Sequence, residues 1–343
     1  MPTRHRRRVP PPTIARANPI ELRPRGDFAA WLDSTGGTLA VTTYNSGKVA
    51  LFSSSDREVI GSYWSFPRPM GLAVAADRMA MATRDHLWTF RTAARANSTD
   101  AAVLLLDAVF DTGRLDAHDL AFDRRGLLFA NTRFNCAARP SERVNFLASW
   151  RPPFMSGVVA GDFCHLNGIG VRDGRLAAAT AFCDRATRAA WREGDRFTSG
   201  VLIDVRQNAI ALRGLCLPHS PRWHAGAWWF CNSGEGTLCV WRPADGAYET
   251  VAGLPGFTRG LCFAGGRAVV GLSRIRKQHI LDAPPVRQRC RRMHSGISLV
   301  DPATCRETGS LEFVRGGREV YDVAFIPRAI GVEFASTPAE QLP

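Results

Sequence analysis

The sequence predicts an all-β protein, a six-bladed β-propeller, from three patterns. A short motif, in which a polar or charged residue leads into an apolar strand, occurs six times. Successive copies are separated by 48, 49, 53, 39 and 62 residues, close to the repeat length of propeller blades. Further short apolar segments follow several copies after Asp/Gly turns, which indicates more than one strand in each blade.

The six copies share one register, which we define by the residue before the Gly-Leu-like pair. These register residues are Met70, His118, Asn167, Ser220, Arg259 and Tyr321. The copies span residues 68–74, 116–122, 165–171, 218–223, 257–263 and 319–325. We expect each copy to form the innermost strand of one blade.

The remaining elements are assigned in chain order. Residues 1–25 hold seven Arg and one Glu with several Pro, and we expect a disordered tail there. A helical turn is expected over 27–32, and the segments 38–44 and 48–52 predict a hairpin. This hairpin has no motif copy before it, and the last copy has little sequence after it. We therefore expect the C-terminal strand to pair with the N-terminal strands and close the ring.

The interior of the chain predicts one domain over residues 26–335, followed by a polar end at 336–343. Second strands are expected at 126–130, 175–180, 227–230 and 267–271. A helix is an alternative for 184–193, where Ala, Arg and Trp replace β-branched residues. The longest interval contains a basic insertion loop, 275–294, without a clean strand pattern.

The net charge of +13 is concentrated in two segments. Residues 1–25 and residues 274–292 each carry +6, so the remaining body is close to neutral. This distribution disfavours a phosphate-binding face across the whole surface. Nucleic-acid association through the tail and the loop stays an alternative hypothesis.

The cysteines and the N-terminus bear on location. None of the nine Cys forms a Cys-x-x-Cys pair, which favours reduced thiols and a cytoplasmic protein. No apolar run follows the basic N-terminus, which disfavours secretion. No stretch of about 18 apolar residues occurs, so we expect no membrane span.

Polar residues at the start of the innermost strands carry the candidate chemistry, because these positions converge on the propeller axis. The predicted ligand-binding residues are Arg68, Asp116, Asn167, Ser220 and Arg259. His118, His165 and His219 are candidate ligands of a divalent metal, Zn or Fe. Glu319 and Tyr321 are candidates for proton transfer. The two arginines suit a carboxylate or a phosphate.

These residues leave several interpretations open. The first is an axial pocket that binds a small anionic ligand or a peptide side chain, with a metal-dependent enzyme as one form of it. The second is a structural network, in which Asp119 and Asp322 bond the backbone of neighbouring strands. A third is a non-catalytic scaffold that binds a protein partner on its rim.

The ordered motifs also resemble a known family. They include Cys164-His-Leu-Asn-Gly168, Pro218-His-Ser-Pro-Arg-Trp223 and Gly256-Phe-Thr-Arg-Gly-Leu261. Together with Arg68-Pro-Met-Gly-Leu72 and Asp116-Ala-His-Asp119, they resemble a bacterial family of conserved proteins predicted to be six-bladed propellers. The resemblance covers roughly residues 27–328 and implies the same fold, but it implies no particular reaction.

Overall fold

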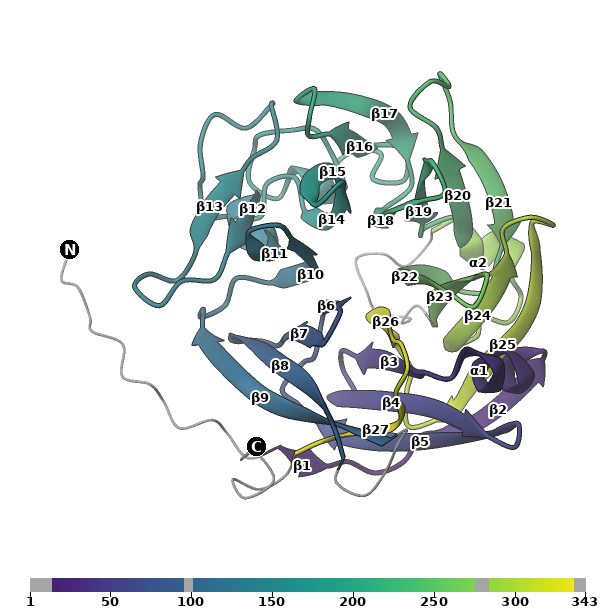
Figure 1. Ribbon diagram of the computed structural model, residues 1–343. Helices are drawn as coiled ribbons and strands as arrows, with labels where there is room; N and C mark the ends of the chain where they lie inside the picture. The colour runs from purple at the N-terminus through teal and green to yellow at the C-terminus, as the bar shows by residue number, and fades with distance from the viewer. Residues whose placement is uncertain (1–13, 96–100, 275–283, 336–343) are drawn as a thin grey trace.

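The computed structural model describes residues 14–95, 101–274 and 284–335. In it six sheets stand around one axis, antiparallel except for the pairing of β27 (Ile330–Phe334) with β9 (Ala101–Asp111), which confirms the six-bladed propeller (Figure 1). We number the blades by the order of their second strands along the chain. Besides the strands, the described residues form the helices α1 (Phe28–Thr35) and α2 (Val286–Arg289) and short 3₁₀ turns at Thr132–Phe134 and Ala190–Arg192.

The first three blades contain the following strands, from the axis outward. Blade 1 is β26 (Asp322–Ile326), β3 (Thr38–Thr43), β4 (Lys48–Ser55), β5 (Glu58–Ser65) and β1 (Ala15–Arg16). Blade 2 is β6 (Leu72–Ala75), β7 (Arg78–Ala82), β8 (His86–Ala94), β9 (Ala101–Asp111) and β27 (Ile330–Phe334). Blade 3 is β10 (Ala117–Asp123), β11 (Gly126–Asn131), β12 (Cys136–Arg139) and β13 (Leu147–Trp150).

The other three blades follow the same plan. Blade 4 is β14 (Leu166–Arg172), β15 (Arg175–Ala181), β16 (Gly200–Asp204) and β17 (Ala209–Leu215). Blade 5 is β18 (Pro218–His224), β19 (Ala227–Asn232), β20 (Thr237–Trp241) and β21 (Glu249–Gly253). Blade 6 is β22 (Phe257–Ala264), β23 (Arg267–Ser273), β24 (Gly296–Asp301), β25 (Arg306–Arg315) and β2 (Glu21–Gly26).

The sequence motif marks the innermost strands correctly. Each of its six copies contains the start of β6, β10, β14, β18, β22 or β26. The predicted second strands are β11, β15, β19 and β23, and the predicted helical turn is part of α1. The helix considered for 184–193 is reduced to the 3₁₀ turn Ala190–Arg192.

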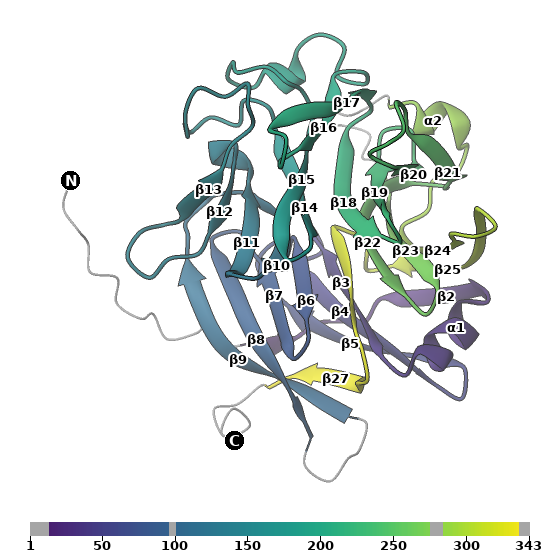
Figure 2. The same ribbon diagram turned by 45° about the horizontal axis from the view of Figure 1, so that its top comes forward.

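Both ends of the chain close the ring. β26 pairs antiparallel with β3, from Asp322 opposite Thr42 to Ile326 opposite Thr38. β27 continues into blade 2, where it pairs in parallel with β9 (Figure 2). At the other end of the chain, β2 pairs with β25 of blade 6 before α1 leads into blade 1. Blades 6, 1 and 2 are therefore connected through both ends of the chain.

The predicted disordered tail is wrong for residues 14–25, while residues 1–13 lie outside the described residues. β1 pairs with β5, and β2 lies antiparallel to β25. Within β2, Leu22 packs against the apolar cluster of blades 1 and 6, and Arg23 forms an ion pair with the buried Glu312 at 3.5 Å. The arginines of this segment are compatible with a β-strand because the buried carboxylate of Glu312 on β25 forms ion pairs with them.

The basic insertion is also partly structural. Residues 275–283 lie outside the described part of the chain, but 284–294 contains α2, whose Val286 is fully buried. Arg289 donates to the carbonyl oxygens of Glu235, Gly236 and Leu254 at 3.1, 2.9 and 2.7 Å. This arginine therefore ties the insertion to blade 5.

The apolar core lies between the faces of adjacent blades. Between blades 1 and 2, for example, Trp64, Phe90 and Phe334 pack together. The innermost strands approach one another closely, and three of the six contacts depend on glycine. A Cβ at Gly71, Gly168 or Gly260 would lie 2.9, 2.6 or 2.7 Å from the backbone or proline ring of the next inner strand.

The other three contacts between inner strands use side chains. Asp119 accepts from the backbone N–H of Ile169 at 3.0 Å, and Ser220 accepts from Gly260 at 3.0 Å. Asp322 accepts from Leu72 at 2.8 Å. Glycine contacts and side-chain contacts therefore alternate around the ring. The alternative interpretation of Asp119 and Asp322, as bonds to neighbouring strands, is confirmed.

Candidate functional site

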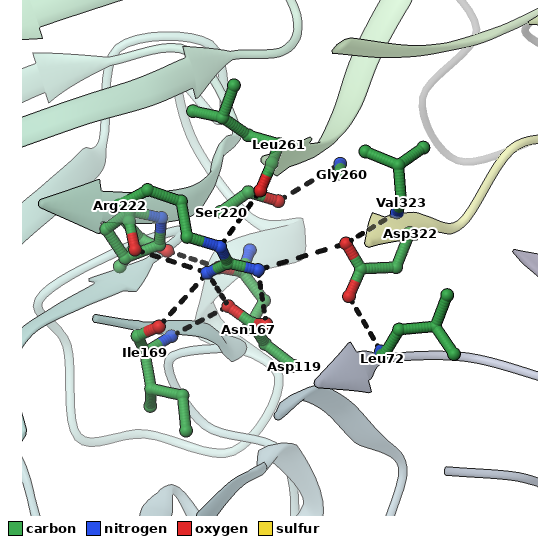
Figure 3. Close-up of polar contacts among 12 residues, drawn as sticks. Leu72, Asp119, Asn167, Ile169, Ser220, Arg222, Gly260, Leu261, Asp322 and Val323 are labelled. Carbon is green, nitrogen blue, oxygen red and sulfur yellow. Dashed lines mark hydrogen bonds and ion pairs between the residues drawn. The ribbon is translucent and has the colours of Figure 1, made fainter. Parts of the chain in front are cut away.

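The side chain of one arginine connects the innermost strands around the propeller axis. Arg222 of β18 donates from Nη1 and Nη2 to the two carboxylate oxygens of Asp119 on β10, at 3.0 and 2.9 Å (Figure 3). It also donates to the carbonyl oxygens of Ile169 on β14 and Leu261 on β22, at 3.2 and 3.0 Å. The guanidinium group thus joins four inner strands at the centre of the ring.

A second carboxylate shares this arginine. Asp322 of β26 lies 3.8 Å from Nη2 of Arg222, and its oxygens accept from Leu72 and Val323 at 2.8 and 2.9 Å. Burial, and then the charge of Asp119, raise the pKa of Asp322 to about 7, although Arg222 and the two N–H donors oppose the shift. We assign this network to holding the inner strands together.

The structure also brings three of the register residues, Arg259, Tyr321 and His118, into contact with one another. The guanidinium carbon of Arg259 lies 3.3 Å from the ring centre of Tyr321, a cation–π contact. The ring of Tyr321 lies 5.8 Å from that of His118, and on its other side it stacks on Tyr44 at 5.2 Å. Ser220, in contrast, is occupied by its bond from Gly260 and has a structural role.

Aromatic side chains continue this contact around the axis. The ring of His118 lies 4.8 Å from that of His165, which in turn lies 4.5 Å from Phe182. Phe182 contacts His219 at 5.3 Å, and His219 contacts Phe257 at 5.7 Å. The three predicted histidines, Tyr321 and Arg259 therefore border one axial site, and we use this name for them together with Asn167.

The three imidazoles share one pattern of hydrogen bonds. Nδ1 of His118 lies 2.7 Å from the carbonyl oxygen of Asp116, and Nδ1 of His219 lies 3.0 Å from that of Leu217. Because a carbonyl oxygen only accepts, both rings carry their proton on Nδ1. Nδ1 of His165 lies 3.0 Å from the carboxylate of Asp162, which favours the same tautomer. In the neutral rings of His118 and His219, Nε2 is then an acceptor.

Two of these imidazoles are held neutral. Burial is the main cause that lowers the pKa of His118 and of His219 well below the usual value. The guanidinium of Arg259 and the neighbouring imidazoles lower both pKa values further. At neutral pH both rings therefore offer lone pairs, and Arg259 supplies positive charge.

Three hydrogen-bond donors of the axial site are buried without a partner among the described residues. They are Nη2 of Arg259, the hydroxyl of Tyr321 and Nδ2 of Asn167. The amide oxygen of Asn167 accepts from Thr180 at 2.7 Å, which orients the side chain. Burial raises the pKa of the Tyr321 hydroxyl, although the Arg259 guanidinium, which approaches it without a well-formed hydrogen bond, opposes this, so the hydroxyl stays protonated and remains a donor. Buried donors without acceptors are uncommon in proteins and are costly.

The remaining predicted residues lie at the edge of the site. The Asp116 side chain is exposed, and its carbonyl oxygen orients His118. The exposed Arg68 lies over the ring of Tyr44 at 5.5 Å. Glu319 accepts a hydrogen bond from Asn45. Both Arg68 and Asp116 have φ of 51°, in the left-handed region, as the chain turns into the inner strand.

Sequence reasoning missed Arg222, Asp162 and Trp191. Arg222 lies within a motif copy, two residues after the register residue, and that position signals an axial side chain. Asp162 precedes His165 by three residues, and Trp191 donates to its carboxylate at 3.1 Å. Although burial raises the pKa of Asp162, the His165 charge and the hydrogen bonds outweigh burial and lower it.

The predicted metal site stays a prediction. Within residues 14–95, 101–274 and 284–335, no three His, Cys, Asp or Glu side chains are grouped closely enough to hold a metal ion. All nine cysteines lie in these ranges and are free. Burial raises the pKa of the Cys164 thiol well above its usual value, so this neighbour of His165 is not a thiolate at neutral pH.

Residues 26–333 match a family model described as a domain of unknown function, DUF4915. The chain belongs to this family. Its members are thus represented here by a six-bladed propeller. No curated protein matches this DUF4915 chain in sequence. Among the helices that the structure describes, none has the length and apolar character needed to cross a membrane.

Solved structures resemble the DUF4915 propeller in fold alone. A chain of a nidogen/laminin complex is 11% identical, with a TM-score of 0.51, and the match covers 85% of this chain and 99% of that one. The computationally designed Ika8 protein is also 11% identical, with a TM-score of 0.41 and coverage of 84% and 90%.

Proposed function

We propose that the axial site binds a small molecule that carries a carboxylate or phosphate group. The observation that supports this most directly is the set of three buried donors without partners, on Arg259, Tyr321 and Asn167. An anionic group offers several acceptors at once and forms charge-assisted bonds with a guanidinium group. The rings of Phe182 and Phe257 border the same site and suit the apolar part of such a ligand.

An anion fits this site better than a divalent metal ion. The Arg259 guanidinium is close enough to lower the pKa of both His118 and His219, and the same positive charge opposes a bound cation. Metal analysis of the protein purified without an affinity tag tests this preference. Stoichiometric Zn or Fe that is lost in a His118→Ala, His165→Ala variant would favour the metal-dependent hypothesis instead.

Thermal unfolding in the presence of acetate, succinate, citrate and inorganic phosphate tests the proposal. We expect at least one of these anions to raise the melting temperature of the wild-type protein in a saturable way. Arg259→Gln should abolish this response. Arg242→Gln is the matched control, because Arg242 is exposed and directly follows β20, the third strand of blade 5 from the axis. An equal response in Arg259→Gln and wild type would contradict the proposal.

A further inference from the structure

Two loops of blade 4 fix the imidazole of His165. Its Nδ1 atom lies 3.1 and 3.0 Å from the two carboxylate oxygens of Asp162, which precedes β14. The indole N–H of Trp191, from the 3₁₀ turn between β15 and β16, donates to the same carboxylate at 3.1 Å. The carboxylate is therefore itself held in place while it orients the histidine.

Aromatic rings hold His165 from two more sides. The rings of Phe182 and Trp191 lie 4.5 and 4.3 Å from the imidazole. Asp162 and His165 also have φ of 50° and 53°, in the left-handed region that Asp and His adopt more often than most residues. The side chain is thus fixed before any ligand binds.

In this arrangement, Nε2 is the nitrogen of His165 that remains available to accept a proton. Nδ1 carries the proton that faces Asp162, and no hydrogen bond reaches Nε2 from the part of the chain that the structure describes. The ring of His118 separates this imidazole from the ring of Tyr321, at 4.8 and 5.8 Å from the two rings. The base on His165 and the amide donor on Asn167 therefore lie two residues apart at the start of β14, and the hydroxyl donor of Tyr321 lies beyond His118.

We propose that the axial site is catalytic and hydrolyses an ester of a small anionic molecule, with His165 as general base and Asp162 as its positioning residue. This inference rests on the proposed anion-binding function, because Arg259 would hold the acidic group of the substrate. The combination of a base with neutral donors is the one that acyl transfer requires.

The reaction needs only water as a co-reactant. Nε2 of His165 takes a proton from water, one O–H bond breaks, and the water oxygen bonds to the ester carbonyl carbon. The C=O electron pair moves to the carbonyl oxygen, to which Asn167 donates a hydrogen bond, and it returns to re-form the C=O bond in the next step. The bond to the alcohol oxygen then breaks, and the alcohol leaves with the proton from His165.

Hydrolysis of mono-4-nitrophenyl fumarate, whose free trans carboxylate cannot reach its own ester carbonyl, tests this proposal in the full-length protein. After the rate without protein is subtracted, we expect saturable release of 4-nitrophenol, and faster turnover of this ester than of 4-nitrophenyl acetate at equal concentration. His165→Gln should lower kcat by about 100-fold or more, the usual contribution of a general base. His86→Gln is the matched control, since His86 begins β8 in blade 2, and its rate should equal that of the wild type.

Asp162 is tested separately as a positioning residue. Asp162→Asn should lower kcat and leave KM unchanged, because an amide can donate to Nδ1 and move the proton to Nε2. Nitrogen NMR should show this change of tautomer at His165, and Asp162→Glu should recover part of the rate. If His165→Gln does not fold, the comparison of Asp162→Asn with Asp162→Glu decides the question.

The outcomes distinguish the two proposals. Absence of saturable hydrolysis, or equal rates in the wild type and His165→Gln, would overturn catalysis. Saturable binding of succinate that depends on Arg259, measured by calorimetry in the same samples, would then still support the anion site. Loss of both hydrolysis and succinate binding in the wild type would overturn both.

Discussion

Arg222 is a buried cation that two carboxylates neutralise. Its side chain donates to Asp119 and to carbonyl oxygens of two further strands, and it lies within 3.8 Å of Asp322. A buried ion pair of this kind adds little stability compared with an apolar replacement of the whole group. Removal of one partner alone has a much larger effect, since the remaining charges stay buried.

Arg222→Met should lower the free energy of unfolding by about 3–5 kcal/mol, because Asp119 and Asp322 then lose their counter-ion inside the ring. Chemical denaturation at pH 7 measures this change. The control is Arg242→Met, which removes exposed pairs with Asp245 and Glu249 at 3.6 and 3.7 Å. That loss should be below about 1 kcal/mol. Similar losses in the two variants would contradict a structural role for the axial arginine.

His118 and His219 should make stability depend on pH. Their pKa values are lowered in the folded protein, whereas the unfolded chain binds protons at the usual value of about 6.5. Their contribution is therefore present above pH 6.5 and is lost as the pH falls below it. Asp322 has the opposite effect, because its pKa is raised to about 7 and its contribution falls as the pH rises toward that value.

The difference between variants isolates the histidines. We expect the His118→Gln, His219→Gln double variant to lose less stability than the wild type when the pH is lowered from 7 to 5. Urea denaturation at several pH values gives both slopes. Parallel slopes for the two proteins would show that these imidazoles do not titrate differently on unfolding.

At the scale of the element, the spacing of inner strands depends on small residues. A Cβ on Gly168 of β14 would lie 2.3 Å from the hydroxyl of Thr180 and 2.6 Å from the ring of Pro221 on β18. Gly168→Ala should therefore lower the free energy of unfolding by about 1–3 kcal/mol. Gly246→Ala is the control, since a Cβ there meets nothing within 4 Å. Denaturation of both variants measures the difference, and equal stability would contradict this packing.

The sequence predicts the inner strands well because one motif repeats in register. A polar residue, a small or acidic residue and an apolar strand recur in most copies, and the structure uses them as the axial layer, the contact layer and the core. His118, His165 and Tyr321 could be placed near the axis for this reason. The structure brings them together as neighbouring rings.

The sequence does not predict contacts that depend on loop geometry. Trp191 lies in a segment without a repeat, and its bond to Asp162 joins two irregular loops. The Arg/Pro-rich start of the chain looks disordered in composition, yet Arg23 and Arg25 both lie 3.5 Å from the buried Glu312. The composition of residues 14–25 indicates a preference for solvent. It does not reveal that β25, near the other end of the chain, supplies both a pairing strand and a carboxylate for these arginines.

For the whole molecule, ring closure depends on the last strands. β26 begins with Asp322 at the centre, directly after Tyr321, and pairs with β3, while β27 pairs with β9. A chain that ends at Arg318 lacks both strands and leaves the inner edge of β3 unpaired. We expect this shorter chain to unfold without a cooperative thermal transition, which circular dichroism measures.

Two further chains make this test specific. A chain that ends at Ala335 keeps every described strand and should melt like the full-length protein. Addition of a synthetic peptide of residues 319–335 to the shorter chain should restore cooperative melting. If the chain that ends at Arg318 melts at the wild-type temperature, β26 is not required for closure.

The Arg222 guanidinium couples the movements of the blades. Its bonds reach β10, β14 and β22, so none of these strands can shift away from the centre without breaking a bond to the same group. A displacement of one blade therefore disturbs the others through a single side chain.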